Sequence, residues 1–215
     1  MMNKYIYLSL KAFLVACFIF LWLFNSTPKA KAPVITVVDP LILPTEFTHF
    51  KNRSFRKALN KMYFAPSAIY IPSIKVKASI EFLGVDKSGV MEAPKNFFNV
   101  GWLKYSSKNG QTGNLVISGH YDTTTGAPAI FYNLNKLKPN DIILIYSKTK
   151  SNRILTKKYK ITKKYLADPK NPLDVRKAFE KTDNPTITLI TCNGIWNPIK
   201  KEYSKRVVVK GVLVN

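Results

Sequence analysis

The chain has 215 residues, of which 46% are hydrophobic, and its formal net charge is +22. This length and composition support one folded domain with an appendage and exclude a disordered protein. Thirteen prolines and many Ile, Val, Thr, Tyr and Phe residues favour a β-rich fold over a helical bundle. The positive field attracts polyanions, namely nucleic acid, anionic lipid headgroups or acidic wall polymers, and charge alone does not choose among them.

The first predicted element is an apolar segment, Ile6–Phe24, whose only charge is Lys11. As a helix it would be roughly 28 Å long, close to the ~30 Å thickness of a hydrocarbon core. Lys4 and Lys11 precede its most apolar part, which places the N-terminus in the cytoplasm. Ala30-Lys31-Ala32 leaves removal as a signal peptide open, but Pro33 disfavours cleavage there. We therefore expect an uncleaved single-pass anchor in the cell membrane, with the rest of the chain extracytoplasmic.

The remainder divides into a linker and a folded domain. Residues 1–24 are the cytoplasmic start and anchor, residues 25–68 a linker with a short helix near 54–62, and residues 69–215 the domain. Short β-rich runs separated by turn residues predict seven or eight strands in an all-β barrel or sandwich. The interval 162–185 is expected to be a loop that holds a short helix. The runs are YIPSIKVKASIEFLGV, FFNVGWLKY, NLVISG, DIILIY, RILTKKYKI, TITLITC and RVVVKGVLV.

The domain contains a single cysteine, Cys192, because Cys17 lies in the anchor. Cys192 follows an alternating strand pattern and precedes Asn193-Gly194, so its sulfur is expected at the open end of a strand. A lone extracytoplasmic cysteine is either a buried small hydrophobe or a group retained for its reactivity. Both interpretations are open at this point.

A catalytic cysteine needs a proton-transfer partner and a group that stabilises an oxyanion. His120, which ends the run NLVISG, is the only histidine of the domain, because His49 lies in the linker. Arg206 opens the last run. If the runs before and after a loop at 193–205 pair as antiparallel strands, Cys192 and Arg206 become neighbours. A guanidinium would then lie beside the thiol.

The sequence contains no motif for the other common kinds of catalytic or binding site. The domain lacks the His and Cys residues of a usual zinc site, and no phosphate loop, GxSxG elbow or HExxH motif is present. We expect no cofactor and no metal, although a calcium site built from separated carboxylates stays open. Nucleic acid is not expected as a partner, because an exported domain rarely meets it and no recognised binding motif appears.

Three features in order make the sequence similar to the sortases, the membrane-anchored cysteine transpeptidases of bacterial surfaces. They are GHYD within NLVISGHYDTTTGAPAIFYNLNKLKPND, the motif TLITC, and the arginine that opens RVVVKG. The resemblance covers roughly residues 68–214. The segments IPSIKVKASIEFLGV and NVGWLKYS resemble the class lettered E or F more than the pilin-building enzymes.

The resemblance implies a closed eight-stranded β-barrel and a two-step acyl transfer. By matched position, Cys192 is the nucleophile, His120 the proton-transfer group and Arg206 the oxyanion or substrate ligand, while Thr191 helps to line the substrate pocket. The implied substrates are proteins with an LPxTG-like sorting signal, and the implied acceptor is an amine such as that of a peptidoglycan precursor. Two alternatives stay open: a basic, membrane-tethered, non-catalytic module that binds anionic wall polymers, and a Cys-His hydrolase.

Overall fold

The computed structural model of the chain describes residues 63–214. The predicted anchor, the helix expected near 54–62 and His49 lie outside the described residues. Among residues 63–214, no helix is long and apolar enough to cross a bilayer.

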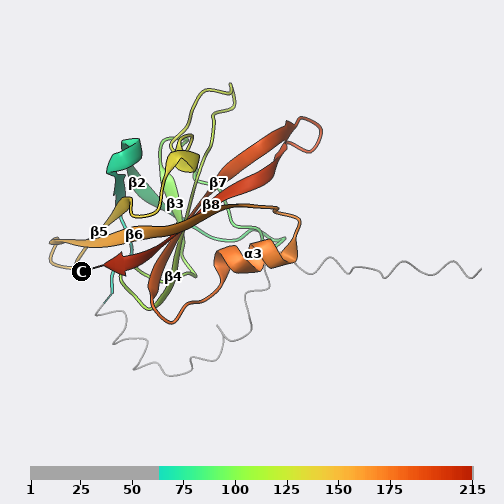
Figure 1. The fold of residues 1–215 in the computed structure, drawn as a ribbon. Helices are drawn as coiled ribbons and strands as arrows, with labels where there is room; N and C mark the ends of the chain where they lie inside the picture. The colour runs from blue at the N-terminus through green and yellow to red at the C-terminus, as the bar shows by residue number, and fades with distance from the viewer. Residues whose placement is uncertain (1–62, 215) are drawn as a thin grey trace, which may run out of the picture. The chain divides into compact units, whose positions relative to one another are not determined.

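The strands of the described region form one closed barrel in the order β1, β2, β3, β4, β7, β8, β6, β5 (Figure 1). Neighbours are antiparallel except for β2 with β3 and β4 with β7. The prediction of a closed eight-stranded barrel with short helices in its loops is confirmed. The strands are β1 (Ala68–Ile71), β2 (Val76–Leu83), β3 (Val100–Leu103), β4 (Gly113–Gly119), β5 (Ile142–Lys148), β6 (Ile154–Ala167), β7 (Pro185–Asn197) and β8 (Glu202–Val214). The helices are η2 (Pro72–Ile74), η3 (Leu134–Lys136) and α3 (Pro172–Phe179).

Two predicted loop boundaries are wrong. The loop expected at 193–205 is a hairpin, because β7 continues to Asn197 and β8 begins at Glu202. The Asn193-Gly194 turn signal marks an irregularity in the β7–β8 pairing between Asn193 and Trp196, with Gly194 at φ +88°. The loop expected to begin at 162 begins later, because β6 continues to Ala167.

Apolar side chains pack on both faces of the part of the sheet formed by β4, β7 and β8. Alternation along β4, β7 and β8 directs one set of residues into the barrel, including Leu115, Leu189 and Val209, each no more than 1% exposed. On the opposite face, Val208 packs with Ala178 of α3. Helix α3 therefore covers part of the outer face of β8 (Figure 1).

Helix α3 begins where the sequence supplies a cap. The Leu173 backbone N–H donates to the Asn171 side-chain oxygen at 3.0 Å, and Pro172 follows as the first helical residue. An asparagine cap satisfies one of the unpaired donors of the first turn, and proline at the next position lacks a donor to satisfy. The short helix predicted in this interval is thus present, and its start is fixed by these two residues.

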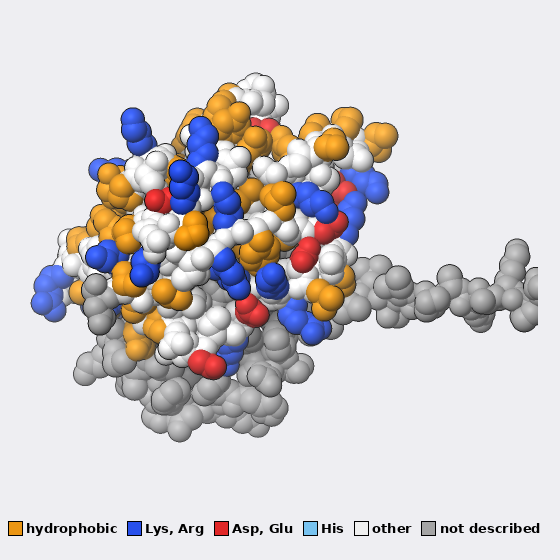
Figure 2. Space-filling view, viewed as in Figure 1, with side chains coloured by type: hydrophobic (Ala, Val, Ile, Leu, Met, Phe, Trp, Pro, Cys, Tyr) orange, Lys and Arg blue, Asp and Glu red, His pale blue; other side chains and the backbone are white. Residues whose placement is uncertain are grey.

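On the face of the barrel that Figure 2 shows, positive charge is spread rather than gathered in one patch. Strand β6 carries exposed lysines at 157, 158 and 160. Lys210 on β8 differs from these, because it is only 6% exposed. A buried ammonium needs a specific partner, and for Lys210 that partner is Glu180, on the loop after α3.

The buried Tyr159 makes the fold sensitive to alkaline pH. Its hydroxyl accepts from the Gly110 backbone N–H at 2.8 Å, and burial raises its pKa from 10.0 to about 12. The stability linked to this raised pKa is complete below about pH 10 and is lost as pH rises through about 12. Urea titrations at a series of pH values in this range give the unfolding free energy as a function of pH. This free energy should fall less steeply with pH in Tyr159→Phe than in the wild type, whereas the exposed control Tyr105→Phe should behave like the wild type. Equal pH dependence in the wild type and Tyr159→Phe would refute the assignment.

Candidate active site

Strands β7 and β8 bring the predicted nucleophile and the predicted arginine together. Cys192 and Arg206 are direct partners in the antiparallel register. Because side chains alternate along a strand and Leu189 points into the barrel, Ile190 and Cys192 lie on its outer face. Cys192 is a free, half-buried cysteine. The predicted neighbourhood of the two residues is therefore present in the structure, whereas their catalytic roles stay predictions.

His120 follows directly after β4, the strand on the other side of β7. The parallel pairing runs to Ser118 opposite Ile190, and the Thr191 hydroxyl donates to the Gly119 carbonyl at 2.8 Å. Continuing this register by two residues puts His120 at the level of Cys192. His120, just past the end of β4, therefore lies at the same level as Cys192 on β7 and Arg206 on β8.

The imidazole of His120 has its own supports. Its Nε2 donates to the Pro94 carbonyl oxygen at 2.8 Å, and its ring lies 4.7 Å from that of Phe97 between centroids. This hydrogen bond assigns the proton of the neutral ring to Nε2, so Nδ1 is the nitrogen available as an acceptor. Among the described residues, His120 makes its hydrogen bond to Pro94 rather than to Cys192.

The strand end beneath His120 depends on close packing. A Cβ on Gly119 would lie 2.6 Å from Cδ2 of the buried Phe131 ring, so a side chain at this position would force that ring to move. Thr191, predicted to line a substrate pocket, is 3% exposed and holds the Gly119 carbonyl. In this structure its hydroxyl joins β7 to β4 just before His120.

Electrostatic effects of opposite sign act on the Cys192 thiol. Burial raises its pKa most, Arg206 lowers it, and the carboxylate of Asp122 raises it again. Nη1 of Arg206 donates to the carbonyls of Tyr203 at 2.8 Å and Lys205 at 2.9 Å, which fixes the guanidinium beside its own strand. The resting thiol is therefore protonated near neutral pH, and Arg206 is the group that favours its thiolate.

Sequence reasoning missed a contact between the loop after His120 and the β7–β8 hairpin. The Tyr203 hydroxyl donates to the Asp122 carboxylate, and this hydrogen bond raises the pKa of Tyr203 to about 12. The Tyr121 ring packs against Tyr203 at 5.7 Å between centroids. Because the Tyr203 carbonyl accepts from Arg206, this tyrosine connects the histidine's loop to the arginine. The one sequence feature that could have indicated this contact is Asp122, the acidic residue of the GHYD motif.

Asp122→Asn should lower the pKa of Cys192, because it removes a negative charge near the thiol while keeping an acceptor for the Tyr203 hydroxyl. The measurement is the rate of iodoacetamide alkylation against pH, followed at Cys192 by peptide mass spectrometry. The midpoint should shift to lower pH. The control Asp168→Asn alters a carboxylate bound to Lys205 and should leave the midpoint in place. A midpoint that rises in Asp122→Asn would contradict this account.

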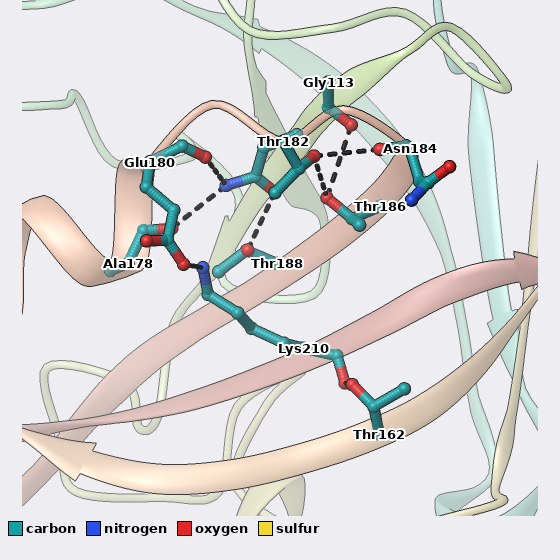
Figure 3. A network of polar contacts seen from close by, with 10 residues as sticks. Gly113, Thr162, Ala178, Glu180, Thr182, Asn184, Thr186, Thr188 and Lys210 are labelled. Carbon is teal, nitrogen blue, oxygen red and sulfur yellow. Dashed lines mark hydrogen bonds and ion pairs between the residues drawn. The ribbon is translucent and has the colours of Figure 1, made fainter.

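A polar network holds the segment after α3 against the sheet (Figure 3). Asn114 of β4 donates from Nδ2 to the carbonyls of Ala178 at 3.1 Å and Glu180 at 3.2 Å. Its Oδ1 accepts from the buried Thr188 hydroxyl at 2.8 Å. One carboxamide therefore joins β4, β7 and the C-terminal end of α3.

The same network contains the partner of the buried lysine. Lys210 Nζ lies 2.8 Å from Oε1 of Glu180, as Figure 3 shows, and its side chain is 8% exposed against 44% for Glu180. Burial lowers the pKa of Lys210, and the hydrogen bond to Glu180 opposes that effect. The ion pair thus fixes the loop between α3 and β7 over the outer face. The contact with Lys210 places this loop four residues along β8 from Arg206, on the side of Val208 that α3 covers.

Asn114→Ala should destabilise the chain by about 2–3 kcal/mol, because two carbonyls and the Thr188 hydroxyl lose their partner in a buried setting. Urea denaturation measures this loss. Asn171→Ala is a matched control in the same segment, and loss of its exposed cap costs about 1 kcal/mol. The account fails if Asn114→Ala costs no more than Asn171→Ala.

Within residues 63–214, no group of three His, Cys, Asp or Glu side chains is placed to hold a metal ion. The side chains gathered at the strand ends are instead a thiol, an imidazole, a guanidinium and a carboxylate that accepts from a tyrosine. This set can provide a nucleophile, a proton-transfer group and a fixed positive charge for a developing oxyanion.

Comparison with known proteins identifies the fold. The family model of the sortase domain matches residues 69–214. A lid mutant of sortase A from Corynebacterium diphtheriae is 26% identical, with a TM-score of 0.53 over 70% of each chain. Sortase C-1 from Actinomyces oris is 25% identical, with a TM-score of 0.53 over 82% of this chain and 87% of that one.

A sortase D5 transpeptidase from Clostridium perfringens, 22% identical, shares the fold with a TM-score of 0.51 over 80% of this chain and 93% of that one. No curated protein sequence matches the chain. The sortase family model nevertheless covers more than half of the sequence, and the closed barrel agrees with it. The chain belongs to the sortase family.

Proposed function

We propose that this protein is a membrane-anchored cysteine transpeptidase that cleaves an LPxTG-like sorting signal and transfers the surface protein to an amine, that of a peptidoglycan precursor. The family consists of cysteine transpeptidases that act on sorting-signal proteins and cell-wall acceptors. The observation that carries the proposal is the direct pairing of Cys192 with Arg206, beside the strand end that leads to His120.

In the first step, the Cys192 thiol gives its proton to Nδ1 of His120, and the resulting thiolate attacks the carbonyl carbon of the threonine in the sorting signal. The oxyanion that forms is stabilised by N–H groups of Arg206 that are not engaged by the Tyr203 and Lys205 carbonyls. The carbon–nitrogen bond then breaks, and His120 gives a proton to the departing glycine amine. The product is a thioester between Cys192 and the threonine.

In the second step, an acceptor amine attacks the thioester carbonyl. His120 takes a proton from that amine, the carbon–sulfur bond breaks, and Cys192 leaves as a thiolate. The new amide retains the acyl group that the cleaved peptide supplied, so no ATP is needed outside the cell. Ile190, which is partly exposed two residues before Cys192 on the same face of β7, offers a surface for an apolar part of the signal.

The subclass and the location are part of the same proposal. The sequence segments that resemble classes E and F support an enzyme that does not build pili. The apolar segment 6–24 supports a single-pass anchor in the cell membrane, with the N-terminus cytoplasmic and the barrel extracytoplasmic. An anchored enzyme would work beside anchored substrates at raised effective concentration.

The experiment is product analysis on a library of LPxTG-like peptides, with and without triglycine. A peptide joined to triglycine is the expected product. Cleavage that yields only free acid would favour the Cys-His hydrolase. Absence of cleavage, with salt-sensitive polyanion binding that Cys192→Ala does not alter, would favour the non-catalytic wall-binding module.

A further inference from the structure

The β7–β8 hairpin extends past the barrel (Figure 1), and its end carries exposed apolar side chains. We call the set Ile195, Trp196, Ile199, Lys200 and Lys201 the hairpin tip. Ile199 is 91% exposed, Ile195 80% and Trp196 47%, and the two isoleucines are the most exposed large hydrophobic residues of the described chain. Figure 2 shows hydrophobic side chains gathered at this end of the molecule, with basic side chains beside them. Clustered exposed apolar groups mark an interaction surface more often than isolated ones do.

The hairpin tip has a built structure. The Asn197 side chain accepts from the backbone N–H groups of Ile199 and Lys200, both at 3.0 Å. The Ile195 N–H donates to the Ser204 hydroxyl at 2.9 Å, and the Trp196 ring packs on Tyr203 at 5.1 Å between centroids. These contacts fix the backbone of the turn and the Trp196 ring, and they leave Ile195 and Ile199 exposed.

The charge at the hairpin tip helps to decide which kind of partner it binds. Lys200 and Lys201 are exposed on the turn, and the next residue, Glu202, is paired with Lys170 at 2.8 Å. An anionic bilayer surface offers phosphates to lysines and an apolar boundary to isoleucine and tryptophan. A soluble wall polymer offers only the phosphates, and leaves the two isoleucines in water.

We propose that the hairpin tip seats on the anionic surface of a lipid bilayer, with its three apolar side chains at the acyl boundary and its two lysines at the headgroups. Cys192 lies four residues before Trp196 on the same strand, roughly 13 Å away at strand spacing. The seated tip would hold the candidate active site close to the bilayer surface. This inference goes beyond the proposed function and stands without it.

The test uses the full chain carrying Trp22→Phe, reconstituted from detergent into vesicles of phosphatidylcholine and phosphatidylglycerol with brominated acyl chains. Bromine quenches only tryptophans that approach the acyl region. Trp196 emission should fall by about twofold, because interfacial segments lie about 5–10 Å into the headgroup boundary. The buried Trp102, 4% exposed, supplies a constant background that a Trp196→Phe variant measures.

Ile195→Ser with Ile199→Ser should abolish the quenching, while the exposed control Ile154→Ser, on β6, should leave it unchanged. Vesicles without phosphatidylglycerol, or Lys200→Glu with Lys201→Glu, should weaken it. Equal quenching in the double-serine variant, or no quenching in the parent, would overturn the proposal. A shift of Trp196 emission with soluble polyglycerol phosphate, without lipid quenching, would assign the tip to a wall polymer instead. Because the readout is not activity, failure here leaves the transpeptidase proposal intact.

Discussion

Replacing Cys192 with alanine is expected to abolish both cleavage and transfer, lowering kcat/KM by at least about four orders of magnitude, as for other enzymes that lose their nucleophile. Without the thiol there is no nucleophile to carry the acyl group, and the guanidinium of Arg206, which is always charged, cannot replace it. Hydrolysis of a quenched LPxTG-type peptide measures the loss.

Cys192→Ser is the matched variant, because it keeps nearly the same volume and removes only the sulfur. It should also be strongly impaired, since a serine hydroxyl is a weaker nucleophile than a thiol and loses its proton far less readily. Full activity in Cys192→Ala would remove Cys192 from the mechanism.

Arg206→Ala should lower kcat by about 10²–10³-fold, the range found when a group that stabilises an oxyanion is removed. A second effect distinguishes oxyanion stabilisation by Arg206 from a general disturbance of the structure. Because Arg206 lowers the pKa of Cys192, its loss should move the pH midpoint of Cys192 alkylation upward. Single-turnover acylation and the alkylation profile together provide the measurement.

Lys205→Ala provides the control for Arg206→Ala, since it removes the adjacent cation, which pairs with Asp168 at 2.9 Å. It should leave acylation close to wild type. Arg206→Lys keeps the positive charge and loses the planar guanidinium group. Its acylation rate should therefore lie between those of the wild type and Arg206→Ala. Equal activities of Arg206→Ala and Lys205→Ala would contradict the assigned role.

Much of the barrel was predictable because its strands follow local rules. The alternation around Leu189 marked β7, and the turn residues between runs separated most of the strands. The positions where strand pairing is irregular were not predicted. Gly194 signals a turn in sequence but sits in an irregular stretch of the β7–β8 pairing, and β6 shifts register between Ile161 and Lys163 before continuing to Ala167. A glycine or a run of lysines does not distinguish a loop from an irregular strand, since the partner strand decides.

In the candidate site too, some contacts were predictable from local sequence patterns and others were not. The pairing of Cys192 with Arg206 follows from two strands that are consecutive in sequence, so antiparallel geometry predicted it. The position of His120 requires β4 to lie parallel to β7, which no local pattern specifies. Residues 81 apart form the Asp122–Tyr203 hydrogen bond. Such contacts are set by the topology of the closed barrel, which the family resemblance implied and local sequence patterns alone did not.

Buried polar groups were the hardest to predict. Asn114 looks like an ordinary strand residue, and Lys210 is one of many lysines, yet the first joins three segments and the second is buried against Glu180. Burial of a polar side chain depends on a partner 30 or more residues away, and composition carries no trace of that partner. Both hold the end of α3 and its following loop against the sheet.

The central claim is that Cys192 carries the acyl group. Intact-mass spectrometry of the full chain, quenched in acid shortly after mixing with an LPxTG-type peptide, tests it most directly. The expected result is an adduct with the mass of the peptide up to its threonine, located on Cys192 by fragmentation and lost when triglycine is added before quenching. Cleavage of the peptide with no adduct on Cys192, or with an adduct on another residue, would contradict the account.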